Sequence, residues 1–108
     1  MLAPAHQPLD PDKAIRSTDD DAAHARISAV RKGYLEDPFI ALLVPRAHLV
    51  PTRAPLIHIG TFVRSEAIDI LIKGWIALMS TESQIQIVSL GAGSDSRFWR
   101  LMVSLCPL

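Results

Sequence analysis

Residues 84–95 read Q-I-Q-I-V-S-L-G-A-G-S-D, and this stretch decides the expected fold. The span Gln84 to Leu90 is short and rich in β-branched side chains, which is typical of a strand. It passes directly into a turn that contains Gly91 and Gly93. Residues 96–105 then have the apolar spacing of a helix. The order of strand, glycine turn and helix predicts an α/β fold that begins with this strand.

The G-A-G-S-D turn is typical of sites that bind a nucleotide-containing cofactor. Glycine has no side chain to keep a ligand away from the backbone, and the helix that follows offers unpaired amides. The third glycine of the dinucleotide pattern is missing, and Arg97 stands two positions after Asp95. A cofactor without a pyrophosphate, such as S-adenosylmethionine, therefore fits better than a dinucleotide. Taken alone, the turn is equally compatible with a simple strand-to-helix connection.

The residues before this stretch predict helices. A first helix opens near Thr18, where Asp19 to Asp21 would favour the positive end of the helix dipole, and ends at Gly33. A short element over 34–44 and a proline-rich loop over 45–55 follow. Another helix starts around Gly60. Its predicted buried stripe consists of Val63, Ala67, Ile68, Leu71, Ile72, Trp75 and Met79.

The chain is thus expected to divide into three parts. Residues 1–14 form a disordered tail, 15–80 a helical segment, and 81–108 the first strand and glycine turn.

The charge of the chain is balanced. Eleven basic residues stand against eleven acidic ones, which argues against nucleic-acid and membrane-surface partners. One cysteine, no secretory signal and no membrane-spanning run predict a cytoplasmic protein, and we expect a monomer. The four histidines lack the paired spacing of metal ligands.

Four blocks carry a family resemblance. They read I-R-S-T-D-D-D-A (15–22), S-A-V-R-K-G-Y-L-E-D-P-F-I (28–40), G-T-F-V-R (60–64) and Q-I-V-S-L-G-A-G-S-D-S-R-F-W-R-L (86–101). In this order they resemble the leucine carboxyl methyltransferase family. That family transfers a methyl group from S-adenosylmethionine to the C-terminal leucine carboxylate of the type 2A protein phosphatase catalytic subunit. The resemblance implies a Rossmann-like methyltransferase fold, this cofactor and this partner.

The resemblance also implies a set of cofactor-binding residues. Arg64 closes the G-T-F-V-R block and, with Arg26, is expected to contact the carboxylate of the cofactor. Gly91, Ala92 and Gly93 are expected to lie against its methionine part. A planar guanidinium can grip a carboxylate with two parallel hydrogen bonds. Without the resemblance, composition favours a solvated surface residue for Arg64. For Arg26 the two interpretations are about equal, because Arg16, Arg31 and Lys32 are alternative basic residues nearby.

The sequence also departs from the family. His58-Ile59 stands where relatives usually have Asn-Arg. The family continues well beyond the matched region, with the ribose contact, the adenine pocket and most of the substrate cleft. We therefore expect this 108-residue chain to be inactive by itself. A non-catalytic truncated product and a fragment of another nucleotide-binding α/β protein are the alternatives.

No catalytic residue is predicted. A nucleophile, a base and an orienting group do not occur at usable spacing in the sequence. This pattern suits methyl transfer to a carboxylate, because the attacking group is ionised near neutral pH without help from the protein. Catalysis would then consist mainly of proximity and orientation.

Overall fold

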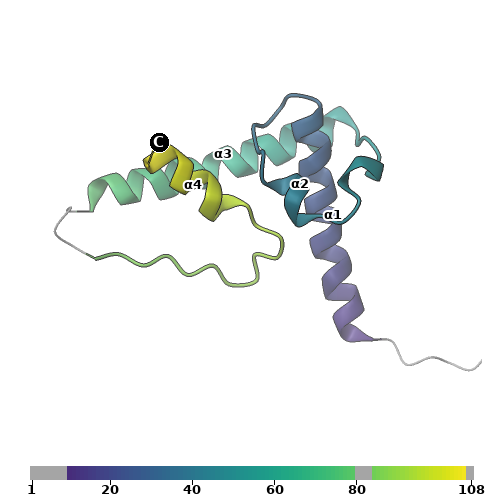
Figure 1. The fold of residues 1–108 in the computed structure, drawn as a ribbon, viewed down its shortest axis with the longest axis horizontal. Coiled ribbons are helices and arrows are strands. Elements are labelled where there is room, and N and C mark those ends of the chain that lie inside the picture. The colour runs from purple at the N-terminus through teal and green to yellow at the C-terminus, as the bar shows by residue number, and fades with distance from the viewer. Residues whose placement is uncertain (1–9, 80–83, 107–108) are drawn as a thin grey trace, which may run out of the picture.

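The computed structural model describes residues 10–79 and 84–106, which form four α-helices and one 3-10 helix. The helices are α1 (Pro11–Arg31), α2 (Ile40–Leu43), η1 (Ala47–Leu49), α3 (Pro55–Leu78) and α4 (Arg97–Leu105). Figure 1 shows α1 crossing α3 near the start of α3, with α2 beside the crossing. An extended segment leads back along the molecule to α4, which lies beside α3.

Two helices begin earlier than the sequence predicted. α1 starts at Pro11, because the Asp10 side chain accepts a hydrogen bond from the Asp12 amide at 3.0 Å and caps the helix. α3 starts at Pro55 instead of near Gly60. Asp19 therefore lies in the middle of α1, where its side chain is available for contacts with other parts of the chain.

The prediction of an α/β fold that opens with a strand at residues 84–90 is wrong for the described residues. These residues are extended, but they form no strand, and no strand occurs elsewhere in 10–79 or 84–106. A strand is defined by hydrogen bonds to a neighbouring strand, and the described segments provide no such neighbour. Ile87 and Leu90 are accordingly exposed. The predicted helix after the glycine turn is present as α4.

The three-part division of the chain stays a prediction. Most of its disordered tail, residues 1–9, lies outside the described residues, as do residues 80–83 and 107–108. Within the described part, no helix is long and apolar enough to span a membrane.

A small apolar core holds α2 and the loop after it against α1. Ala23 and Ile27 of α1 pack with Ile40, Val44 and Val50. The crossing of α1 with α3 is polar instead. The Ser28 hydroxyl lies 2.7 Å from Nε2 of His58 and accepts a hydrogen bond from the Arg53 amide at 2.7 Å. Ser28 is fully buried, so its small side chain lets the two helices approach closely.

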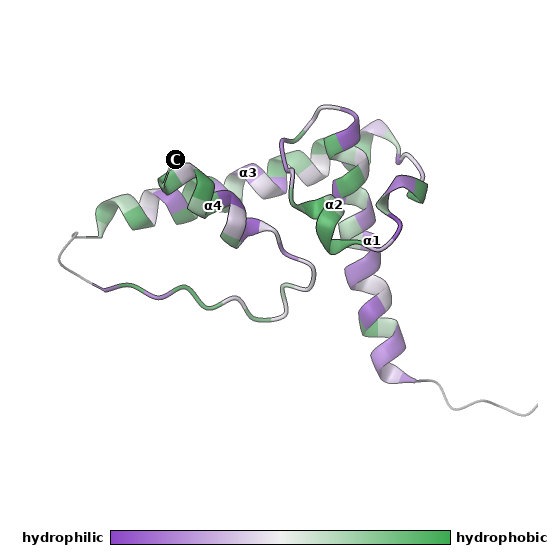
Figure 2. Ribbon diagram, in the orientation of Figure 1, coloured by the Kyte–Doolittle hydropathy of each residue, from purple (hydrophilic) through white to green (hydrophobic). Residues whose placement is uncertain are grey.

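The buried face of α3 differs from the predicted apolar stripe. His58, Ser65 and Asp69 are its buried residues, whereas Leu71 is 72% exposed and Trp75 is 42% exposed. Apolar residues recur along this helix, as the colours of Figure 2 show, and many of them are exposed, so periodicity does not select a face. Polar contacts from α1 and α4 select it.

Asp37 joins three elements at one buried carboxylate. It accepts hydrogen bonds from Nε of Arg26 on α1 and from the hydroxyl of Ser96, each at 2.5 Å. The backbone amides of Phe39 and Ile40 donate to its other oxygen at 3.0 and 3.1 Å. These bonds fix α1, the start of α2 and the residue that precedes α4 relative to one another.

Asp69 attaches α4 to α3 in a similar way. It accepts a hydrogen bond from Nε of Arg97 at 3.0 Å and another from Nη1 of Arg100. Arg100 also lies near Asp37, with 3.7 Å between its Nε and the carboxylate. The two aspartates and the arginines around them form one continuous buried network.

The surroundings of both aspartates favour their ionised forms. Burial opposes ionisation of Asp37, but hydrogen bonds from Ser96 and Arg26 outweigh it and hold its pKa below the ordinary 3.8. Burial opposes ionisation of Asp69 as well, and its bonds to Arg100 and Arg97 lower its pKa in the same way. Both groups therefore stabilise the fold only while they are charged.

We expect the free energy of unfolding to decrease as the pH falls below about 4. Both folded pKa values lie below the unfolded value, so this stability is complete above the unfolded pKa and is lost as the pH falls through the folded one. Asp37→Asn should lower the free energy of unfolding at pH 7 by about 3–5 kcal/mol, because it leaves Arg26 buried without a counter-charge. The variant should also show a weaker pH dependence.

Urea unfolding followed by circular dichroism measures both effects. Glu36→Gln is the matched control, because Glu36 is exposed and adjacent. If Asp37→Asn is as stable and as pH-sensitive as this control, the role assigned to Asp37 is wrong.

Candidate functional site

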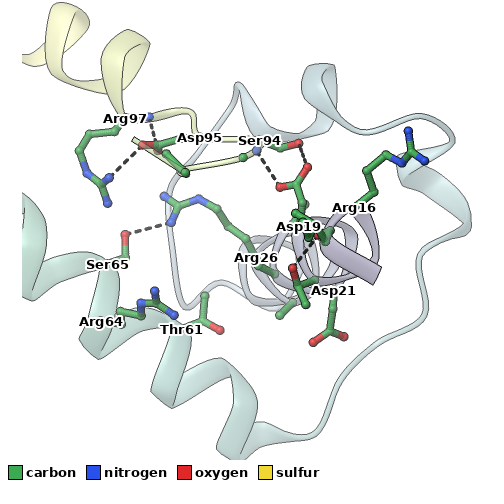
Figure 3. A pocket seen from close by; sticks show the side chains of 18 residues that line it. Arg16, Asp19, Asp21, Arg26, Thr61, Arg64, Ser65, Ser94, Asp95 and Arg97 are labelled. Carbon is green, nitrogen blue, oxygen red and sulfur yellow. Dashed lines mark hydrogen bonds and ion pairs between the residues drawn. The ribbon is translucent and has the colours of Figure 1, made fainter. Parts of the chain in front are cut away.

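An open hollow of about 790 Å³ lies between α1, α3 and the glycine turn (Figure 3). All five residues predicted to bind a cofactor line it: Arg26 from α1, Arg64 from α3, and Gly91, Ala92 and Gly93 from the turn. The structure therefore brings together residues from three separate segments of the chain.

Arg26 is held in place on two sides of its guanidinium. Its Nε donates to Asp37, and its Nη1 donates to the hydroxyl of Ser65 on α3 at 3.0 Å. Figure 3 shows the side chain extending from α1 toward Ser65 and the turn. Its Nη2 is buried and has no hydrogen-bond partner among the described residues. A buried donor without a partner is costly, so this nitrogen suits an acceptor supplied by a ligand.

Arg64 provides a second positive charge. It precedes Ser65 on α3 and is exposed at the edge of the hollow, near Thr61 of the preceding turn (Figure 3). Within residues 10–79 and 84–106 its side chain forms no ion pair. A guanidinium in this state can bind an anionic group of a ligand.

The turn needs glycine at two positions for conformational reasons. Gly91 has φ 63° and Gly93 has φ 60°, values in the left-handed region that other residues adopt with strain. Position 93 requires glycine for a steric reason as well, because a Cβ atom there would lie 2.7 Å from the carboxylate carbon of Asp19. The Asp95 amide donates to the Gly93 carbonyl at 2.9 Å and tightens the turn.

Sequence reasoning missed the contact between Asp19 and the turn. One carboxylate oxygen of Asp19 accepts from the Ser94 amide at 2.7 Å, and the other accepts from the Ser94 hydroxyl at 2.9 Å. The sequence alone places Asp19 in a charge run at the start of a helix. The spacing of Asp19 and Arg26 could have indicated that Asp19 lies at the same site. The two residues are seven apart, so they share one face of α1.

The other charged residues of the hollow are largely neutralised by neighbours. Arg97 pairs with Asp95 at 3.0 Å and also with Asp69. Asp21 pairs with Arg53 at 2.8 Å. Arg64 and the unpartnered nitrogen of Arg26 thus remain available, and together these donors can hold a carboxylate.

Polar, acidic and basic side chains line the hollow. Among the described residues no histidine, cysteine or lysine lines the hollow. Across residues 10–79 and 84–106, no group of three His, Cys, Asp or Glu side chains could hold a metal ion. The arrangement can grip an anion and offer backbone atoms to a ligand.

The sequence is similar to proteins of one family. The family model described as leucine carboxyl methyltransferase matches residues 14–104. A leucine carboxyl methyltransferase 1 from Cryptococcus neoformans is 45% identical over 107 residues, which cover 89% of this chain and 29% of that relative. The protein of the same name from Emericella nidulans is 44% identical over 102 residues, covering 89% of this chain and 26% of the relative.

A third relative has a different name. The human tRNA wybutosine-synthesizing protein 4 is 41% identical over 91 residues, which cover 82% of this chain and 13% of that protein. No solved structure matches the chain. The chain spans less than a third of the length of each of these three relatives. Because the family model covers residues 14–104, the chain belongs to the leucine carboxyl methyltransferase family.

Proposed function

We propose that this chain holds the amino-acid end of S-adenosylmethionine in a carboxyl methyltransferase. The observation that carries the proposal is the convergence of Arg26 and Arg64 on one hollow, together with the buried Nη2 of Arg26, which has no hydrogen-bond partner among the described residues. Two guanidinium groups suit one carboxylate. The positive φ values of Gly91 and Gly93 support close approach of the methionine part of the cofactor to the backbone.

The hydrogen bonds of the turn favour a cofactor without phosphates. The Ser94 amide donates to Asp19, the Asp95 amide donates to Gly93, and the Arg97 amide donates to Asp95 at 2.9 Å. Amides of this kind bind the phosphates of dinucleotides at the start of a helix. Here protein acceptors already occupy these three amides. A nicotinamide or flavin dinucleotide is therefore disfavoured.

The residues of the site would act by orientation. When bound, S-adenosylmethionine supplies an electrophilic methyl group on its sulfonium sulfur. Arg26 and Arg64 would hold the far end of the cofactor, and the turn would fix its position along the hollow. The attacking carboxylate of the substrate needs no base, because an α-carboxyl group has a pKa of roughly 3.3–3.7. Catalysis would then consist mainly of holding the methyl group and the attacking oxygen in line.

The proposed substrate is the C-terminal leucine carboxylate of the type 2A protein phosphatase catalytic subunit. Similarity to proteins named leucine carboxyl methyltransferase 1 supports this choice. The similarity to a protein named for tRNA wybutosine synthesis suggests RNA as another partner. We disfavour RNA, because eleven acidic residues balance the eleven basic ones and leave no excess positive charge for phosphates.

The free Cys106 suits a reducing compartment, and we propose that the protein acts in the cytoplasm.

Arg64→Ala should weaken binding of S-adenosylmethionine by about ten- to hundredfold, the equivalent of one hydrogen bond between charged groups. Isothermal titration of the 108-residue chain measures the affinity. Lys73→Ala is the control, because it removes the same charge from α3 at an exposed residue outside this hollow. Equal affinities of the two variants would contradict the proposed role of Arg64.

The substrate proposal can be tested in a chimera. Residues 14–104 would replace the matching segment of the Cryptococcus neoformans relative. We expect the chimera to transfer a labelled methyl group to a peptide with a free C-terminal leucine, and not to its C-terminal amide. The 108-residue chain alone should bind the cofactor without turnover. A chimera that binds the cofactor but leaves the leucine peptide unmodified would contradict the substrate proposal. Turnover by the isolated chain would show that our expectation of inactivity is wrong.

A further inference from the structure

The glycine turn has little support from its own backbone. The extended residues 84–90 lead into it, and between residues 84 and 92 the described part of the chain shows no backbone hydrogen bond. Leu90 is 88% exposed, so the apolar side chain next to the turn does not anchor it either. The position of the turn must therefore be set by contacts with other elements.

Asp19 makes the contacts that connect the turn to α1. Its two oxygens accept the amide and the hydroxyl of Ser94, which is 75 residues away in the sequence. The carboxylate also fills the space in which a side chain at position 93 would lie. Asp19 and Arg26 project from one face of α1, so the same helix surface holds the turn and presents the unpartnered donor of Arg26.

We propose that Asp19 is the positioning residue of the glycine turn. It holds the backbone of residues 91–93 against α1. In this position the turn lies beside Arg26 and Arg64, which bind the carboxylate of the ligand. The inference rests on the proposed cofactor site and adds a residue that does not itself touch the cofactor. Asp19 is not a member of the small apolar core of Ala23, Ile27, Ile40, Val44 and Val50, and its side-chain hydrogen bonds go to Ser94, so its main effect is on the turn.

Titration with S-adenosylhomocysteine tests the effect on binding. Asp19→Ala should weaken binding by about tenfold, because both charge-assisted bonds to Ser94 are lost. Asp19→Asn keeps one acceptor oxygen for the Ser94 amide and should recover part of the affinity. Asp20→Ala removes the same charge from the next residue, which is exposed, and should stay within about twofold of the wild type.

Amide hydrogen exchange measures the position of the turn without ligand. Exchange of residues 91–97 should become faster in Asp19→Ala and remain unchanged in Asp20→Ala, while amides of α1 and α3 keep their protection. Unchanged exchange of the turn, or wild-type affinity of Asp19→Ala, would overturn the inference. If the wild type fails to bind S-adenosylhomocysteine, the proposed function and the ligand part of this inference are wrong, and the exchange measurement still decides whether Asp19 holds the turn.

Ser94→Ala serves as a second variant if Asp19→Ala does not fold. It removes only the bond between the Ser94 hydroxyl and Asp19, and leaves the amide bond and all charges in place. We expect a severalfold loss of affinity and faster exchange limited to the turn. Wild-type values for both measurements would overturn the inference.

Discussion

The ion pair between Arg26 and Asp37 is the constraint on which the described part of the molecule depends. A buried carboxylate and a mostly buried guanidinium are costly unless their charges and hydrogen bonds are matched. Asp37 is matched by Arg26, Ser96 and two backbone amides, and these partners come from α1, α2 and the start of α4. Meeting this requirement fixes the arrangement of the elements. It also orients Arg26 so that one nitrogen remains for a ligand.

The site combines a fixed side chain with a turn that requires glycine. Arg26 is held by Asp37 of the loop before α2 and by Ser65 of α3, whereas Gly91 and Gly93 adopt backbone conformations that only glycine reaches without strain. Asp19 links the two parts, because it bonds to Ser94 from the helix that also carries Arg26. The hollow is therefore defined by side-chain bonds between distant segments more than by a shared apolar core.

Some of this could be predicted from the sequence, and the reasons are specific. The glycine turn and the helix after it depend on local residue types, and both are present. The family resemblance indicates Arg26 and Arg64, and both residues line one hollow. The predicted strand was wrong because a strand depends on a partner that the described residues lack. The buried face of α3 and the role of Asp19 depend on contacts with residues far along the chain, which periodicity does not reveal.

The central claim is that Arg26, with Arg64, receives the carboxylate of an amino-acid-like cofactor beside the glycine turn. A crystal structure of the chain with S-adenosylhomocysteine tests it most directly. The account predicts that the ligand carboxylate lies within hydrogen-bond distance of Nη2 of Arg26 and of the Arg64 guanidinium, with its homocysteine part against residues 91–93. A ligand carboxylate bound elsewhere, with Nη2 of Arg26 still without a partner, would contradict the account.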